Sequence, residues 1–295
     1  METHTVISKD GTTIGYRQLG QGPGLVILHG AMESSQSHIQ LAEVLSPEFT
    51  VYLPDRRGRG LSGPYSSTHT IQTDIDDVSA LIDKTAATNI FGVSSGAIIA
   101  MHACLQLPAV KKVAIFEPPI GVDRESSAQM MQRFDSEISE GKTSAALVTA
   151  MKATEMGPPI FKYFPRRLLE WLTTMAMSHE KSPPTSSSHG GDETVAPATF
   201  RELAPTLHYD FQLSLSLSDE ESISNLREIT TEVLLLSASQ SPQYLRSAVD
   251  RLENVLPNIN RRVNFTGAGH GVTGNVDRRG QPKRAAEELQ KFFST

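Results

Sequence analysis

The chain alternates short apolar runs with longer segments in which apolar residues recur every three or four positions. A continuous apolar run is typical of a buried strand, and the longer spacing is typical of a helix with one buried face. The pattern predicts buried strands at residues 25–28, 51–53, 89–92, 113–116, 233–236 and 261–265. It predicts helices at residues 37–45, 71–82, 243–256 and 282–293, and another directly after residue 94. Strands that alternate with helices indicate a mainly parallel sheet with helices on both faces.

The first residues of the chain show a different pattern. Segments 3–8 and 12–18 alternate polar and apolar residues and flank the sequence Lys9-Asp10-Gly11. Alternating segments joined by an Asp-Gly turn are typical of a β-hairpin. We therefore expect an antiparallel hairpin at one edge of the sheet.

The alternation stops between residues 121 and 227, where helical segments are rich in Met, Ser and Thr. They are broken by Gly157-Pro158-Pro159 and by the low-complexity segment 182–191, which we expect to be a mobile loop. Ligands bind at the carboxyl ends of parallel strands, and an insertion at this point of the chain would cover them. The chain is accordingly divided into a first core part (1–120), a helical cap (121–227) and a second core part (228–295).

Composition and charge narrow the class of protein. The length of 295 residues suits one large α/β domain with an insertion. A net charge of −6, with both signs spread along the chain, argues against a nucleic-acid partner. No apolar run approaches the roughly 20 residues that span a bilayer, and the polar start of the chain is unlike a signal peptide. A single cysteine, Cys104, fits a reducing compartment. We expect a cytoplasmic protein without a membrane span.

The sequence Gly92-Val93-Ser94-Ser95-Gly96 stands where a predicted strand meets a predicted helix. A G-x-S-x-G sequence in this place forms a sharp turn, the nucleophile elbow, which exposes its serine at the top of the sheet. The glycines are needed because side chains two residues before and after the serine would collide. The amide end of the following helix would face the oxyanion that forms on attack. Ser94 is therefore the candidate nucleophile.

Three further motifs accompany this elbow. They are His29-Gly30-Ala31-Met32 after a predicted strand, the turn Asp55-Arg56-Arg57-Gly58-Arg59-Gly60-Leu61-Ser62, and Gly267-Ala268-Gly269-His270 after the last predicted strand. In order and spacing they resemble the oxyanion loop, the D-x-R-G-x-G-x-S turn and the histidine loop of the α/β-hydrolase superfamily. The resemblance covers nearly the whole chain outside the predicted cap. It implies an eight-stranded, mainly parallel sheet with helices on both faces and a helical cap insertion.

A serine hydroxyl is a weak nucleophile at neutral pH and needs a histidine base that a carboxylate holds in one tautomer. His270 is the candidate base, because it lies in a glycine-rich loop after the last strand and follows Ser94 in the superfamily's chain order. The resemblance further implies that the backbone N–H groups of Ala31 and Ser95 form the oxyanion hole. His29 is expected to brace the loop that carries Ala31.

The acid departs from the superfamily's commonest pattern. Most members carry an aspartate in the loop after the next-to-last strand, whereas residues 237–242 of this chain contain no carboxylate. Glu117 ends the strand that follows the elbow strand. One group of haloalkane dehalogenases and the zearalenone lactonases place their glutamate there, and the lactonases also pair a Ser-Ser-Gly elbow with a Glu-x-Pro segment. Glu117 is therefore the candidate acid, and Asp210 is the alternative. The acidic cluster at residues 74–77 is interpreted as a solvated helix face.

Related dehalogenases and epoxide hydrolases require an aspartate in place of Ser94, so the resemblance leaves acyl transfer to water as the expected reaction. The expected substrate is a small-molecule carboxylic ester or lactone, bulky and apolar because methionine and aromatic residues are frequent in the predicted cap. Some of these residues are expected to face a pocket, although packing in the core is the more frequent role for any one of them. They are Met130, Met131, Met151, Met156, Met175, Met177, Phe161, Tyr163, Phe164 and Trp171.

No metal-ligand spacing such as H-E-x-x-H occurs, and we expect neither a metal nor a cofactor. Two alternatives to hydrolysis stay open. One is a non-hydrolytic cyclase or lyase that acts on a polyketide-like metabolite, and the other is a ligand receptor on the same fold with slow turnover.

Overall fold

The computed structural model describes residues 1–157, 159–180 and 198–294. The loop expected at residues 182–191 lies outside the described residues.

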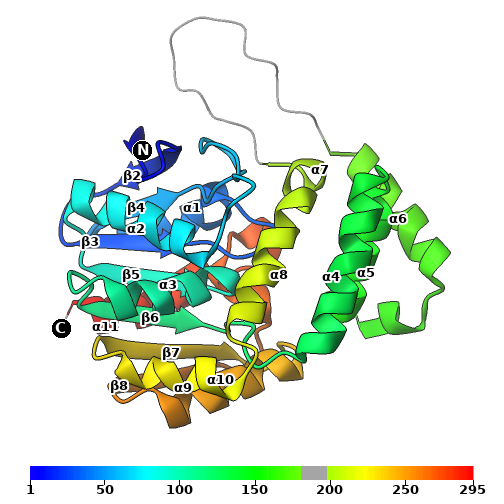
Figure 1. Ribbon diagram of the computed structural model, residues 1–295. Helices are drawn as coiled ribbons and strands as arrows, with labels where there is room; N and C mark the ends of the chain where they lie inside the picture. The colour runs from blue at the N-terminus through cyan, green and yellow to red at the C-terminus, as the bar shows by residue number, and fades with distance from the viewer. Residues whose placement is uncertain (158, 181–197, 295) are drawn as a thin grey trace, which may run out of the picture.

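Eight strands form one sheet in the order β1-β2-β4-β3-β5-β6-β7-β8 (Figure 1). They are β1 (Glu2–Ile7), β2 (Thr13–Leu19), β3 (Gly24–Leu28), β4 (Thr50–Pro54), β5 (Asn89–Val93), β6 (Lys112–Phe116), β7 (Glu232–Ala238) and β8 (Ile259–Phe265). Strand β2 pairs antiparallel with both β1 and β4, and the remaining pairs are parallel. The predicted eight-stranded, mainly parallel sheet and its N-terminal hairpin are confirmed.

Helices cover both faces of this sheet. They are α1 (Ile39–Leu45) and α11 (Pro282–Phe293) on one face, and α2 (Ile71–Thr85), α3 (Ser95–Gln106) and α10 (Gln243–Val255) on the other. In β3, Leu25 and Ile27 pack toward the first face, while Val26 and Leu28 pack toward the second. Successive residues of a strand point to opposite faces, so a strand covered on both sides is apolar throughout. This explains why the central strands appear in the sequence as unbroken apolar runs.

The predicted helix at residues 37–45 is split in two. A 3-10 turn, η1 (Ser35–His38), precedes α1, and His38 is the N-cap residue of α1 with non-helical backbone angles. His38 is fully buried and its ring lies 3.1 Å from the carbonyl oxygen of Thr273, far along the chain. A tertiary contact therefore overrides the local helical periodicity at this position.

Between β6 and β7 the chain forms a helical insertion. Its elements are α4 (Arg124–Ser139), α5 (Thr143–Ala153), η2 (Pro159–Tyr163), α6 (Arg166–Ser178), α7 (Phe200–Leu203), η3 (Ala204–Thr206), α8 (Leu207–Ser216), α9 (Glu220–Ser224) and η4 (Asn225–Glu228). Helices α4, α5 and α6 lie beyond one end of the sheet, and α8 stands between them and the sheet (Figure 1). Phe134 and Phe211 form the centre of an apolar cluster in the insertion, against which Ala31 and Met32 of the core pack.

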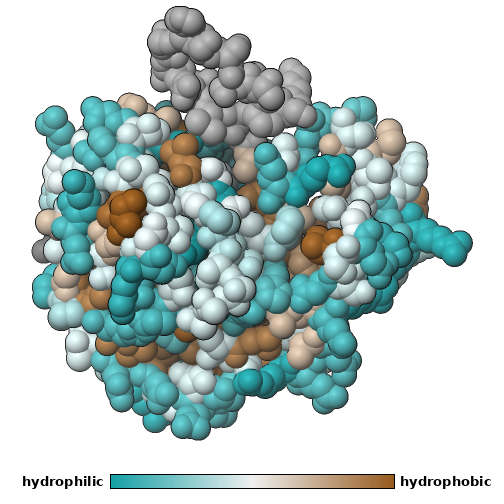
Figure 2. Space-filling view, turned by 45° about the horizontal axis from the view of Figure 1, so that its top comes forward, coloured by the Kyte–Doolittle hydropathy of each residue, from teal (hydrophilic) through white to brown (hydrophobic). Residues whose placement is uncertain are grey.

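On the face shown in Figure 2, hydrophilic residues predominate and apolar residues form separate patches. None of the described helices combines the length and apolar character needed to cross a membrane. 

Candidate active site

Ser94 occupies the sharp turn between β5 and α3. Its φ of 53° and ψ of −120° lie outside the regions that L-residues ordinarily adopt. A Cβ atom on Gly96 would come within 2.3 Å of the carbonyl oxygen of Leu28, and one on Gly92 within 2.5 Å of Ala97 Cα. The glycines of the G-x-S-x-G sequence are thus required by close backbone approach to β3 and α3, and the turn has the strand-to-helix setting of a nucleophile elbow.

Glu117 and His270 are in contact although 153 residues separate them in sequence. His270 Nδ1 lies 2.7 Å from Glu117 Oε2. Glu117 follows β6 directly, and His270 begins the turn η5 (His270–Thr273) after β8. Strands β6 and β8 flank β7 in the sheet, so their carboxyl ends lie at one edge. Because a carboxylate only accepts hydrogen bonds, Nδ1 carries the hydrogen in this contact, and Nε2 is the ring nitrogen left for another partner.

The Glu117 carboxylate is fully buried and accepts two further hydrogen bonds. The Ala238 N–H donates to Oε1 at 2.7 Å, and the Ser241 hydroxyl donates to Oε2 at 2.7 Å. A buried carboxylate needs such donors to offset the loss of water. The Phe116 ring stacks on the His270 ring with a centroid distance of 5.5 Å. These contacts fix both the carboxylate and the plane of the imidazole.

Ala31 and Ser95 lie on either side of the elbow. Ser95 is the first residue of α3, and the first N–H groups of a helix have no partner within the helix. A Cβ atom on Gly30 would come within 3.0 Å of Ser94 Cβ, so the loop that carries Ala31 runs directly past the nucleophile candidate. Both N–H groups therefore belong to segments that adjoin Ser94.

His29 lies at the base of the same loop and is fully buried. Its Nδ1 lies 3.0 Å from the carbonyl oxygen of Gly30, and its Nε2 accepts the Arg56 N–H at 3.2 Å. Burial, together with the charges of Arg59 and Arg56, holds the pKa of His29 well below its usual value. A neutral His29 therefore connects the Gly30 loop to the Asp55 turn.

Asp210, the alternative acid, lies on α8 and is buried among other partners. Its Oδ1 accepts hydrogen bonds from Arg56 Nη1 and from the Ser95 hydroxyl, both at 2.8 Å. Its Oδ2 accepts from Arg59 Nη2 at 2.5 Å. The structure thus brings Glu117 to His270 and places Asp210 in an ion-pair cluster that joins the insertion to the elbow helix.

The interpretation of residues 74–77 as a solvated face is wrong for Asp74 and Asp77, which are both buried. Asp77 accepts two hydrogen bonds from Arg57, whose side chain is fully buried, and Asp74 Oδ2 lies 3.0 Å from His69 Nε2. A buried guanidinium requires a counter-charge close by. Asp77 therefore neutralises the buried Arg57 guanidinium beside the apolar stripe of α2, and Asp74 is buried in contact with His69.

A cavity of about 730 Å³ lies between the insertion and the core. Its apolar lining includes Pro119, Ile120, Met130, Phe211 and Tyr244. Burial, and then the negative charges of Glu117 and Glu155, raise the pKa of the Tyr244 phenol. Pro119 of the lining follows Glu117 by two residues, but Ser94, Glu117 and His270 do not line this cavity. Its volume is within the usual range of small-molecule pockets, roughly 300–1,000 Å³.

Of the methionine and aromatic residues expected to face a pocket, Met130 lines this cavity. Met177 is buried instead, whereas Met156, Tyr163, Trp171 and Met175 are exposed on the outer surface. Trp171 and Met175 lie on α6 and are exposed, so they neither line this cavity nor pack in the core. Composition counts apolar residues in a segment but does not indicate which face of a helix they occupy.

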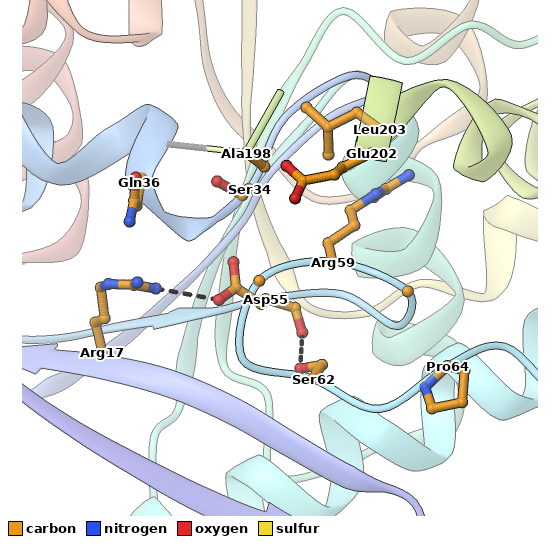
Figure 3. Close-up of a pocket in the computed structure, with 12 residues that line it drawn as sticks. Arg17, Ser34, Gln36, Asp55, Arg59, Ser62, Pro64, Ala198, Glu202 and Leu203 are labelled. Carbon is orange, nitrogen blue, oxygen red and sulfur yellow. Dashed lines mark hydrogen bonds and ion pairs between the residues drawn. The ribbon is translucent and has the colours of Figure 1, made fainter. Parts of the chain in front are cut away.

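A second cavity, of about 450 Å³, lies at the Asp55 turn, and none of Ser94, Glu117 and His270 lines it (Figure 3). Arg17 on β2 donates to Asp55 Oδ2 at 3.1 Å, and the Ser62 hydroxyl donates to the Asp55 carbonyl oxygen at 2.5 Å. The Asp55 carboxylate also accepts the backbone N–H of Leu61. These hydrogen bonds stabilise the turn that begins at Asp55, so Asp55 has a structural role.

Several residues of the site carry no distinctive signal in the sequence. Ser241 donates to Glu117, and Glu33 and His38 connect the Gly30 loop to the loop of His270. Serine, glutamate and histidine are common, and these contacts depend on segments distant in sequence. Within the described residues, no group of three or more His, Cys, Asp or Glu side chains is arranged to hold a metal ion.

Residues 25–286 match the sequence model of the alpha/beta hydrolase family. This chain belongs to the alpha/beta hydrolase family. The match includes the elbow, both candidate partners of Ser94 and the whole helical insertion.

Three curated relatives match shorter stretches of the chain. An uncharacterized hydrolase, YraK, from Bacillus subtilis is 32% identical over 37% of this chain and 42% of its own length. Epoxide hydrolase 2 from Siraitia grosvenorii is 32% identical over 36% and 35%. The pimeloyl-[acyl-carrier protein] methyl ester esterase of Xanthomonas oryzae pv. oryzae is 31% identical over 33% and 37%. The chain thus spans well under half the length of each of these relatives.

A solved structure resembles the chain over its full length. The alpha/beta hydrolase from Sphaerobacter thermophilus is 27% identical, with a TM-score of 0.74 that covers 98% of this chain and 100% of that one. The alpha/beta hydrolase fold is therefore shared throughout, insertion included.

Proposed function

We propose that this alpha/beta hydrolase is a serine hydrolase that cleaves a carboxylic ester or lactone through an acyl-enzyme on Ser94. In this proposal His270 is the base, Glu117 is the acid of the triad, and the N–H groups of Ala31 and Ser95 form the oxyanion hole. The observation that carries it is the 2.7 Å contact between His270 Nδ1 and the buried Glu117 carboxylate. The esterase among the relatives supports ester hydrolysis in general.

The contact with Glu117 determines what His270 can do. Since Nδ1 donates to the carboxylate, Nε2 is the nitrogen available to accept the Ser94 hydroxyl proton as the oxygen attacks the substrate carbonyl. The imidazolium that forms is stabilised by the adjacent carboxylate. Nε2 then returns the proton to the leaving alcohol oxygen as the carbon–oxygen bond breaks, which leaves an acyl group on Ser94.

Water completes the cycle by the same route. His270 takes a proton from a water molecule, the resulting hydroxide attacks the acyl carbon, and the Ser94 oxygen leaves with the proton that His270 returns. In both steps the negative charge develops on the carbonyl oxygen. Two backbone N–H groups beside Ser94, one of them at the N-terminus of α3, suit the stabilisation of that charge.

The volume of the cavity between the insertion and the core supports a substrate of metabolite size. We propose that the insertion acts as a cap and that the Met130 and Phe211 side of the cavity holds the apolar part of the ester or lactone. Tyr244 and the serine residues of the lining add polar contacts. The resemblance of the Ser-Ser-Gly elbow and Glu-x-Pro segment to zearalenone lactonases makes a lactone the first substrate class to assay.

The proposal is tested by the hydrolysis of p-nitrophenyl esters of increasing acyl length. The wild-type protein is expected to turn over these esters, and Ser94→Ala is expected to lose at least about 10³-fold in kcat, since the elements of a triad act as one unit. Circular dichroism and thermal unfolding check that the variant folds. Turnover by Ser94→Ala close to that of the wild type would exclude the acyl-enzyme, and absence of wild-type turnover on esters and lactones would favour the cyclase or receptor alternative.

A further inference from the structure

The loop that carries the candidate oxyanion donor and the loop that carries His270 are joined along their length. His38 Nδ1 lies 3.1 Å from the Thr273 carbonyl oxygen. The Asn275 N–H donates to the Ser37 carbonyl oxygen at 3.0 Å, and Arg278 Nη1 donates to the Met32 carbonyl oxygen at 3.2 Å. The segments on either side of the candidate site are therefore one connected unit, with His38 at its centre.

His38 has acceptors at both ring nitrogens. A backbone carbonyl oxygen can only accept, so Nδ1, 3.1 Å from Thr273 O, must carry a hydrogen. Nε2 lies 3.1 Å from Glu33 Oε2, and a carboxylate oxygen also only accepts. A neutral imidazole has one N–H group and cannot satisfy both contacts. His38 is fully buried, so its ring nitrogens are out of contact with bulk solvent.

Glu33 has the properties of an ionised partner. Its Oε2 also accepts the Gly30 N–H at 2.7 Å. Burial raises the pKa of Glu33, but the His38 charge, the hydrogen bond from His38 and the Gly30 N–H outweigh it and hold this pKa well below its usual value. Glu33 is thus a carboxylate that faces His38 on one side and the Gly30 backbone on the other.

We propose that Glu33 and a doubly protonated His38 form a partly buried ion pair that sets the position of the Gly30–Ala31 backbone relative to the loop of His270. The continuous path runs from the Gly30 N–H through Glu33 and His38 to Thr273, which ends the turn that His270 begins. This role for His38 and Glu33 as positioning residues rests on the proposed function, because it concerns the oxyanion hole and the base of that reaction.

The Glu33–His38 pair contacts the backbone of two loops, the one that carries the candidate oxyanion donor and the one that carries His270. Gly30 precedes the candidate oxyanion donor Ala31, and its Cα lies against Ser94 closely enough that a Cβ would come within 3.0 Å of Ser94 Cβ. A shift of about 1 Å in a catalytic group can lower a rate about 100-fold. Loss of the pair should therefore act on kcat, because the N–H groups of an oxyanion hole bind the transition state rather than the substrate.

The first test is spectroscopic and uses the unsubstituted protein. Long-range ¹H–¹⁵N correlation spectra of protein labelled with ¹⁵N-histidine report whether each ring nitrogen carries a proton. At pH 7 we expect both nitrogens of His38 to be protonated, with its signals assigned by their loss in His38→Gln. A His38 ring with one unprotonated nitrogen at pH 7 would overturn the ion pair, whatever the protein hydrolyses.

The second test separates position from stability. His38→Leu and Glu33→Ala are expected to lower kcat on a p-nitrophenyl ester by about 10- to 100-fold, with KM changed by less than about twofold. Glu33→Gln should lose less, because an amide oxygen in the place of Oε2 can still accept the Gly30 N–H, although it carries no charge opposite His38. The same variant should convert the His38 spectrum to that of a singly protonated ring.

Gln40→Ala is the matched control. Gln40 Oε1 accepts the Val276 N–H at 2.8 Å across the same pair of segments but does not contact Glu33. We expect Gln40→Ala to keep kcat within about twofold of the wild type, since surface substitutions away from a buried network have small effects. Wild-type kcat in His38→Leu, or an equal loss in Gln40→Ala, would overturn the positioning role. If the wild-type protein hydrolyses no ester, the proposed function fails, while the spectra still decide the ion pair.

Discussion

In the proposed triad, two residues from different loops take the place that one aspartate holds in the superfamily's commonest pattern. The loop after β7 supplies the Ser241 hydroxyl, and the carboxylate comes from Glu117 at the end of the neighbouring strand. Glu117 Oε2 receives both this hydroxyl and His270 Nδ1, each at 2.7 Å. Ser241 therefore limits how the carboxylate can rotate away from the imidazole.

At this scale we predict that Ser241→Ala lowers kcat by about 3- to 30-fold, or about 0.7–2 kcal/mol. This is less than the roughly 1.5–3 kcal/mol of a full hydrogen bond to a charged group, because the Ala238 N–H still holds the other oxygen. Steady-state kinetics on a p-nitrophenyl ester measure the loss. Ser237→Ala is the control, since Ser237 is buried in the same part of the chain and its hydroxyl contacts Asn264 rather than Glu117. An unchanged kcat in Ser241→Ala would mean that Glu117 needs no support from this loop.

At the scale of elements, helix α8 joins the insertion to the core through charge. Asp210 is the acceptor for Arg56 and Arg59 of the Asp55 turn and for the Ser95 hydroxyl at the start of α3. All four side chains are buried. Removal of the single acid would leave two buried guanidinium groups without their counter-charge.

We predict that Asp210→Ala lowers the free energy of unfolding by about 3–5 kcal/mol, the usual cost of breaking a buried ion pair from one side. Urea denaturation followed by circular dichroism measures the change. Asp135→Ala is the comparison, because Asp135 pairs with His208 at a partly exposed site of the insertion, where an ion pair contributes about 1 kcal/mol or less. Equal effects of the two substitutions would show that Asp210 does not connect α8 to the core.

The elements themselves follow from local patterns. The final helix begins at Pro282 and ends at Phe293, as the apolar spacing predicts, because one stripe of that helix is buried against the sheet. The helix predicted at 37–45 is interrupted at His38 because a buried polar contact to Thr273 competes with helical periodicity. Local patterns predict where a helix lies, and long-range contacts decide where it begins and which face it buries.

At the scale of the whole molecule, the sequence predicts the sheet, the hairpin and the elbow, since each has a signature within about ten residues. From the sequence, Glu117 could be preferred to Asp210 only through a resemblance to a known family. The 2.7 Å contact between Glu117 and His270 joins residues that are 153 positions apart, so no local pattern indicates it. The burial of Asp77 was missed for the same reason, since its partner Arg57 lies in another segment. Sequence patterns indicate candidate site residues, and the fold determines which of these residues are in contact.

The central claim is that Ser94, His270 and Glu117 act as one catalytic unit, with Asp210 holding the structure. It is tested most directly by the kcat of Glu117→Gln and Asp210→Asn on the same ester, measured side by side on folded protein. Glutamine can hold the wrong tautomer of His270 and cannot stabilise the imidazolium, so we predict a loss of about 10²- to 10⁴-fold in Glu117→Gln. Asp210→Asn should lose far less. A large loss of kcat in Asp210→Asn, together with a kcat near that of the wild type in Glu117→Gln, would contradict this account.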